Sequence, residues 1–172
     1  MIVSNLSSPY TASIDFVFSS GENGTSGKAD ITKADITTLT FKEPLSYSGI
    51  SIKSDETGNE DILSFELSGI PASVPKTIAG DLSLMFSLFT EIIPTKIDSL
   101  PKESFRLSGK VNDIGNELIE VFFTENGLNY TISYDRYSGI PYSVNAGNDE
   151  VSVSVTLSEF TKINTQTKKD VK

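Results

Sequence analysis

Carboxylates are the residues of this chain best suited to chemistry, and they gather in two polar turns. They are Asp55, Glu56, Glu60 and Asp61 in the first turn, and Asp113, Glu117 and Glu120 in and after the second. Oxygen ligands on loops could hold calcium, and two opposed carboxylates could hydrolyse a glycoside. No run matches the twelve-residue EF-hand loop, and solvated turns favour Asp and Asn without a bound ion. Solvated turns are therefore the favoured interpretation, and no metal site is predicted.

The two arginines are the other candidates for anchoring a ligand. Arg106 lies between Phe105 and Leu107, so strand alternation points it away from the apolar face. Arg136 lies in a predicted turn, where Asp135 could pair with it. The pattern favours a solvent or rim position for Arg106, and ligand anchoring by either arginine remains the alternative.

Missing residue types exclude several reaction classes. The chain has no Cys, no His and no Trp. Thiol chemistry, Ser-His-Asp or Cys-His catalysis and classical zinc ligation are therefore excluded within this chain. We predict that the protein is not an enzyme and needs no cofactor, although a carboxylate-only mechanism remains open.

Length and charge narrow the class of protein further. The 172 residues carry 14 Lys and Arg against 23 Asp and Glu, a net charge of −9. A phosphate backbone or an anionic membrane surface would be repelled, so neither is a predicted partner. The length predicts a single domain over 1–172, with an ordered core at about 10–160 and a flexible tail at 161–172.

Alternation of apolar and polar residues predicts about ten short antiparallel strands. Tyr10, Ala12, Ile14, Phe16 and Phe18 show the pattern most clearly, and Asn126-Gly127 is a strong hairpin signal. The predicted strands are 10–19, 28–32, 36–41, 49–52 and 63–67, then 105–111, 118–124, 128–134, 140–144 and 151–157.

One helix is predicted between these two sets of strands. Asp81 is a good N-cap, Pro94 is a stop signal, and apolar residues recur at steps of three and four in the segment 82–93. The segment is far shorter than the ~20 residues that a membrane span needs. The predicted fold is mainly β with one or two helices (α+β): a curved antiparallel half-barrel with this helix packed on its concave face.

Aromatic residues supply the strongest functional signal. The candidates for lining a ligand cavity are Phe16, Phe18, Phe41, Phe65 and Phe123 on strand faces, and Met85, Phe86 and Phe89 on the helix. An ordinary packed core would use the same residues. A wide curved sheet closed by one helix can also leave a crevice that takes an apolar ligand, so both interpretations stay open.

Three segments of the chain carry a family resemblance. They are Ser13–Phe18 leading to Gly27–Ile31, Leu39–Pro44 with Tyr47–Ile52, and Tyr134–Pro141 with the strand that follows. Together they resemble the LolA/LppX-like superfamily of bacterial envelope lipoproteins and lipoprotein carriers. The resemblance spans roughly 10–160. It implies a half-barrel with helices over its mouth, in which several members bind acyl chains.

The chain also departs from that superfamily. Chaperone-type carriers have a Trp-bearing strand before the proline and an inward arginine that latches the lid, whereas this chain has no Trp and Arg106 points outward in the predicted pattern. We therefore do not carry over the shuttle mechanism. The resemblance implies an extracytoplasmic domain of a bacterial envelope lipoprotein that binds a lipid, an acyl chain or another hydrophobic ligand.

No signal peptide is predicted at the start of the given sequence, because Met1-Ile-Val is followed at once by Ser4 and Asn5. A cytoplasmic protein and a mature domain are both consistent with this, and the richness in Ser, Thr, Asn and Gly favours the mature domain. Membrane attachment would then use a lipidated Cys outside this sequence, and an envelope protein could be a partner. The alternative function is a non-enzymatic structural or protein-interaction module of the cell surface with a packed core.

Overall fold

The protein is a single open sheet of antiparallel strands. A computed structural model describes residues 8–54, 62–67, 69–75, 84, 86, 88–89 and 99–163. A short 3-10 turn, η3 (Lys102–Ser104), leads into the second half of the sheet. The strands are β1 (Tyr10–Ser20), β2 (Asn23–Lys33), β3 (Thr38–Glu43), β4 (Ile50–Ser54), β5 (Ile62–Leu67), β6 (Ile70–Pro75), β7 (Phe105–Val111), β8 (Glu117–Glu125), β9 (Leu128–Asp135), β10 (Pro141–Gly147) and β11 (Val151–Lys162).

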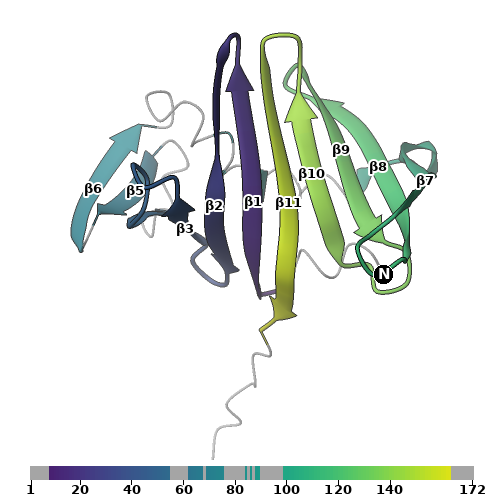
Figure 1. Ribbon diagram of the computed structural model, residues 1–172, viewed down its shortest axis with the longest axis horizontal. Helices are drawn as coiled ribbons and strands as arrows, with labels where there is room; N and C mark the ends of the chain where they lie inside the picture. The colour runs from purple at the N-terminus through teal and green to yellow at the C-terminus, as the bar shows by residue number, and fades with distance from the viewer. Residues whose placement is uncertain are drawn as a thin grey trace, which may run out of the picture.

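Two meanders make up this sheet, and they meet at its centre. The strand order is β6-β5-β4-β3-β2-β1-β11-β10-β9-β8-β7. The β1–β11 pair joins the halves in a register that runs from Tyr10 opposite Lys162 to Ser20 opposite Val151. β6 and β7 are therefore the edge strands, and Figure 1 shows them at the two ends of the curved sheet.

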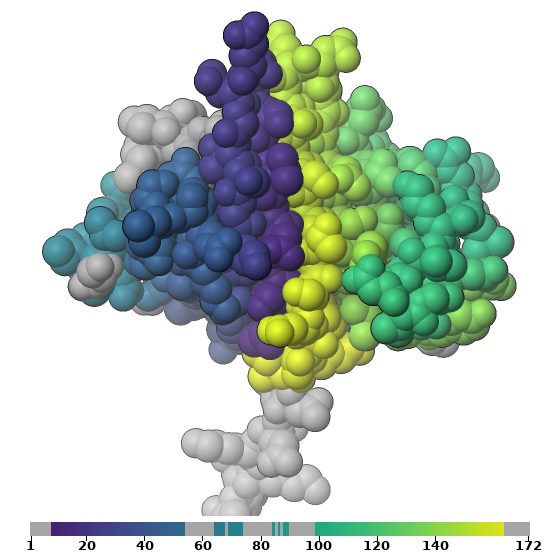
Figure 2. Space-filling model, viewed as in Figure 1, coloured from purple at the N-terminus to yellow at the C-terminus, as the bar shows by residue number. Residues whose placement is uncertain are grey.

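Side chains alternate between an apolar and a polar face of the sheet. In β11, Val153, Val155 and Leu157 are buried, whereas the Ser and Thr residues between them are exposed. The neighbouring β1 matches this pattern, since Phe16 lies opposite Val155. Figure 2 shows β1 (purple) and β11 (yellow) in contact along the middle of the molecule. Each large apolar side chain that is removed from water contributes roughly 1.5–3 kcal/mol to the free energy of unfolding, so burial on the apolar face stabilises the sheet.

The described residues form eleven strands rather than the predicted ten, because the sequence pattern does not predict β6. Pro71 and Pro75 favoured a loop that leads into the helix, but both lie in β6. An edge strand tolerates proline because its outward N–H groups have no partner strand to lose. The structure also extends β2 back to Asn23 and β11 on to Lys162, two residues beyond the predicted ordered core. The rest of the predicted tail, apart from Ile163, lies outside the described residues.

Four residues of the predicted helix are described. Leu84, Phe86, Leu88 and Phe89 have helical backbone, and the last three are buried in the same apolar cluster as the strands. The remainder of 82–93 lies outside the described residues. The ends of the helix and its place on the concave face therefore stay a prediction, whereas the mainly β, antiparallel, curved sheet is confirmed.

Gly27 allows β2 and β3 to approach each other closely. The register shifts between Lys28 and Ala29, where the β2–β3 pairing has a bulge. A Cβ on Gly27 would lie 2.0 Å from the carbonyl oxygen of Glu43 and 2.8 Å from the Pro44 ring. Gly24 on the same strand has more room, since its Cβ would lie 3.5 Å from the nearest atom. Only glycine can therefore occupy position 27 without moving the backbone of β3.

We predict that Gly27→Ala lowers the free energy of unfolding by about 1–3 kcal/mol, the usual cost of overpacking. Urea denaturation followed by circular dichroism measures it. Gly24→Ala is the matched control on the same strand, and we expect a change of less than ~0.5 kcal/mol there. Equal effects of the two substitutions would contradict the role given to the close approach.

Candidate functional site

The candidate site is the apolar face of the sheet, which gathers most of the predicted ligand residues. Phe16, Phe18, Phe41, Phe86 and Phe89 are buried members of one cluster that spans both meanders. Phe65 and Phe123 are partly buried and pack against it. Met85 lies outside the described residues. The structure thus brings these aromatic side chains together, and their contact with a ligand stays a prediction.

Aromatic contacts organise this face on both sides of the central strand pair. The Phe16 and Phe41 rings meet edge to face with centroids 5.7 Å apart, and Phe41 meets Tyr47 in the same way at 5.8 Å. In the other meander, Phe123 and Tyr130 stack with centroids 4.7 Å apart. Offset and edge-on ring pairs add specificity to burial, so both halves of the face have a defined shape.

Two tyrosine hydroxyls are buried polar groups of this face, and the sequence interpretation did not include them. Tyr130 and Tyr134 on β9 are buried, with 1% and 0% of their surfaces exposed. In the part of the chain that the structure describes, neither hydroxyl has a hydrogen-bond partner. The signal was present in the sequence, since Leu128, Tyr130, Ile132 and Tyr134 alternate on one face and tyrosine carries a polar tip.

Burial keeps these hydroxyls neutral. It raises the pKa of Tyr134 far above its usual range, and the nearby Tyr10 raises it further. Burial, with a smaller contribution from Glu125, also raises the pKa of Tyr130. Both groups therefore act as neutral hydrogen-bond donors and acceptors at any physiological pH.

Asp135, at the end of β9, organises the loops beside this face. One carboxylate oxygen accepts hydrogen bonds from the side-chain amides of Asn112 and Asn116, at 2.8 and 2.7 Å. The other accepts from the Tyr137 and Ser138 backbone N–H groups and from the Ser138 hydroxyl, at 2.7–3.0 Å. These five donors satisfy the buried carboxylate and tie the turn after β7 to the turn after β9.

The same donors set the pKa of Asp135. Burial alone would raise it, but the hydrogen bonds from Ser138, Asn116 and Tyr137 lower it to about 2. A carboxyl with that pKa holds no proton to donate near neutrality, and its lone pairs are already engaged. Asp135 is therefore a structural residue.

The expected pairing of Arg136 with Asp135 is wrong. Arg136 forms an ion pair with Glu117 across the turn, where both side chains are partly exposed. The Asp135 carboxylate instead accepts hydrogen bonds from donors in its own turn, such as the backbone N–H of Ser138. These donors lie close to the carboxylate and need no long side chain to reach it. Arg106 is exposed, as predicted, and its guanidinium lies 3.7 Å from the centre of the Phe122 ring.

The second predicted group of carboxylates is dispersed among separate partners. Asp113 accepts a hydrogen bond from the Tyr142 hydroxyl at 2.9 Å, and Glu120 lies 3.5 Å from the Lys110 ammonium. Glu117 is held by Arg136. Within the described ranges, no group of three or more acidic side chains could hold a metal ion. The first group, 55–61, lies outside the described residues.

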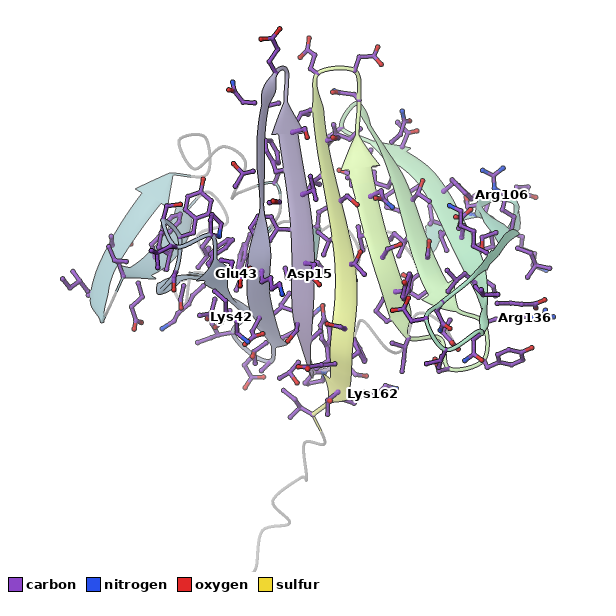
Figure 3. The ribbon with its side chains drawn as sticks, in the orientation of Figure 1. Asp15, Lys42, Glu43, Arg106, Arg136 and Lys162 are labelled. Carbon is purple, nitrogen blue, oxygen red and sulfur yellow. The ribbon has the colours of Figure 1, made fainter. Side chains whose placement is uncertain are left out.

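Charged side chains occupy the polar face, opposite the cluster. Lys42 pairs with Asp30 at 2.6 Å, and Lys53 pairs with Glu66 at 2.7 Å. Figure 3 shows Asp15, Lys42 and Glu43 on one half of the sheet and Arg106 and Arg136 on the other. Exposed pairs of this kind contribute ~0–1 kcal/mol each, so this face is well solvated and adds little stability.

Three surface grooves are lined mostly by residues other than the predicted ligand residues. One of about 290 Å³ runs along the strand ends past Tyr142 and Phe160, and one of about 440 Å³ crosses the polar residues of β9, β10 and β11. A third, of about 550 Å³, borders Gly27 and Pro44. Among the described residues, Phe16 is the one predicted ligand residue at any of these three grooves, so they do not coincide with the predicted site.

Comparison with known proteins supports the fold alone. No family model matches the chain, and no curated protein matches it. An uncharacterized conserved protein from Thermus thermophilus is similar in structure, with a TM-score of 0.56, 14% identity, and coverage of 95% of this chain and 83% of that one. This chain shares its fold.

Structures of the superfamily that the sequence resembles are also among the matches. The LolA superfamily protein from Nitrosomonas europaea has a TM-score of 0.42 and 7% identity, over 95% of this chain and 92% of that one. The Mycobacterium tuberculosis lipoprotein LppX has a TM-score of 0.48 and 12% identity, over 90% and 88%. No helix among the described residues is long and apolar enough to cross a membrane.

We predict that acid destabilises the protein through Asp135. Its pKa is about 2 in the folded state, against ~3.9 in an unfolded chain, so its stabilisation is present above about pH 4 and is lost as the pH falls toward 2. The difference in unfolding free energy between wild type and Asp135→Asn should shrink by ~2 kcal/mol between pH 7 and pH 2.5. Urea titrations at each pH measure it.

A second variant separates the effect of the hydrogen bonds on stability from the effect of the carboxylate charge. Asn116→Ala removes one donor and should move the acid transition of the wild type to higher pH, because fewer hydrogen bonds then stabilise the carboxylate. Parallel pH profiles for wild type and Asp135→Asn would refute the assignment.

Proposed function

We propose that this protein is a non-enzymatic, extracytoplasmic domain of a bacterial envelope lipoprotein that binds a lipid or another hydrophobic ligand on its concave apolar face. The observation that carries the proposal is the continuous apolar cluster across both meanders, from Ile52 on β4 to Val121 on β8. A cluster of that width on one side of an open sheet must be covered, by the chain itself or by a ligand.

Aromatic side chains make this face suitable for an acyl chain. Phe16, Phe41 and Phe89 present wide, non-polar surfaces, and such surfaces predominate in pockets for apolar ligands. The resemblance to the LolA/LppX-like superfamily implies the same class of ligand. Envelope localisation, attachment through a lipidated Cys outside this sequence, and an envelope protein as a further partner belong to the same proposal.

A second candidate function rests on the edge strand β7. Leu107 and Val111 on this strand, and Ile114 in the turn after it, are more than half exposed. An apolar edge strand can pair with a strand of another protein through its free backbone groups. The protein would then be a cell-surface interaction module, and the apolar cluster would be its packed core.

Organic extraction separates the two functions. We expect that lipid extracted from the purified protein, identified by mass spectrometry, is present in near-stoichiometric amount if the concave face is a ligand site. Protein that is free of lipid, and that also fails to take up a pyrene-labelled diacylglycerol, would support the interaction module and contradict the lipid-binding proposal.

We predict that Phe89→Ala changes uptake of this probe and costs less than the ~3–5 kcal/mol typical of a Phe in a fully packed core. Phe89 is 1% exposed, and a residue that lines a cavity loses fewer contacts on truncation. Val17→Ala on the polar face, at a side chain 51% exposed, is the control and should leave uptake unchanged. A full core penalty with unchanged uptake would count against a ligand at Phe89.

A further inference from the structure

We propose that the ligand is a neutral ester lipid whose carbonyl oxygens accept hydrogen bonds from the hydroxyls of Tyr130 and Tyr134. This inference rests on the proposed function, because it names the class of ligand for the same apolar face. It starts from two polar groups that burial in an apolar cluster leaves without partners among the described residues.

The two hydroxyls belong to one strand and to one face of the sheet. Tyr130, Ile132 and Tyr134 are consecutive apolar-face residues of β9, and all three belong to the buried cluster. Four residues of extended strand separate the two tyrosine Cα atoms by ~13 Å. A ligand that lies along β9 could therefore meet both hydroxyls, with Ile132 contacting the chain between them.

Neither hydroxyl is explained by the packing of the protein itself. Tyr130 stacks on Phe123, and Phe would fill that position equally well. Tyr134 is completely buried, and within the described residues nothing accepts from or donates to its hydroxyl. A buried, unpaired hydroxyl costs stability, whereas phenylalanine at the same place would not. The two tyrosines therefore point to a polar atom that the described part of the chain does not supply.

The charge of the site favours a neutral ligand. In the described ranges, the buried polar and charged residues are Thr37, Ser133 and Asp135, and none of these is a cation. Lys33, which lies opposite Tyr10 in the β1–β2 register, is half-buried and already has an interaction of its own. A buried carboxylate without a cation is costly, so an ester carbonyl suits this face better than a free fatty acid.

A pair of matched lipids tests the inference. Dioleoylglycerol carries two ester carbonyls, and its dioleyl ether analogue has the same chains without them. We expect wild-type protein to bind the ester about tenfold more tightly, as two neutral hydrogen bonds would give. In the double variant Tyr130→Phe/Tyr134→Phe, the preference for the ester over the ether should disappear. The ester should bind more weakly than it does to the wild type, whereas the affinity for the ether should stay unchanged.

Tyr142→Phe is the control, since the Tyr142 hydroxyl bonds to Asp113 and lies outside the apolar cluster. It should keep the preference for the ester. Thermal unfolding of lipid-free protein checks the fold. The double variant should melt no lower than the wild type, because the two hydroxyls that it loses have no hydrogen-bond partner among the described residues.

The outcomes separate this inference from the proposed function. If both lipids bind without preference, or if the preference survives in the double variant, lipid binding stands and the role of the tyrosines is refuted. Tighter binding of oleate than of dioleoylglycerol would refute the neutral ester class. If no lipid binds to any variant, the proposed function fails and this inference fails with it.

Discussion

The pairing of β1 with β11 is the constraint on which the whole sheet depends. It joins the two meanders, and through it the apolar faces of both become one surface. Phe16 and Phe18 on β1 lie opposite Val155 and Val153 on β11 in that register. A slip by one residue would turn these side chains of one strand to the polar face and break the cluster at its centre.

Away from the centre, the two ends of the sheet are held differently. The β1–β4 half relies on aromatic contacts around Phe41 and on the close approach at Gly27. The β8–β10 half relies on the buried carboxylate of Asp135, which fixes two turns through local donors. One half of the sheet is therefore stabilised by hydrogen bonds within its turns, and the other by close packing of strands and rings.

Period-two alternation made most of the fold predictable, because one face of each strand is buried and the other is solvated. It failed at β6, where Pro71 reads as a breaker and only the edge position makes it acceptable. The burial of Phe16, Phe18 and Phe41 was predictable for the same reason as the strands. Two features were not predictable: the partners of Asp135, and the Tyr134 hydroxyl, which has no partner among the described residues. Turn geometry and packing decide these features, rather than residue type.

The central strand pair also dictates the order in which the molecule can be completed. Ser13 and Glu159, which meet across β1 and β11, are 146 positions apart in the chain. Closing so long a loop is entropically costly, and folds dominated by such distant contacts form slowly. During synthesis the first meander must wait with β1 as an open edge until β11 has been made. Its unfinished apolar edge is then the part of the nascent chain that a chaperone would need to shield.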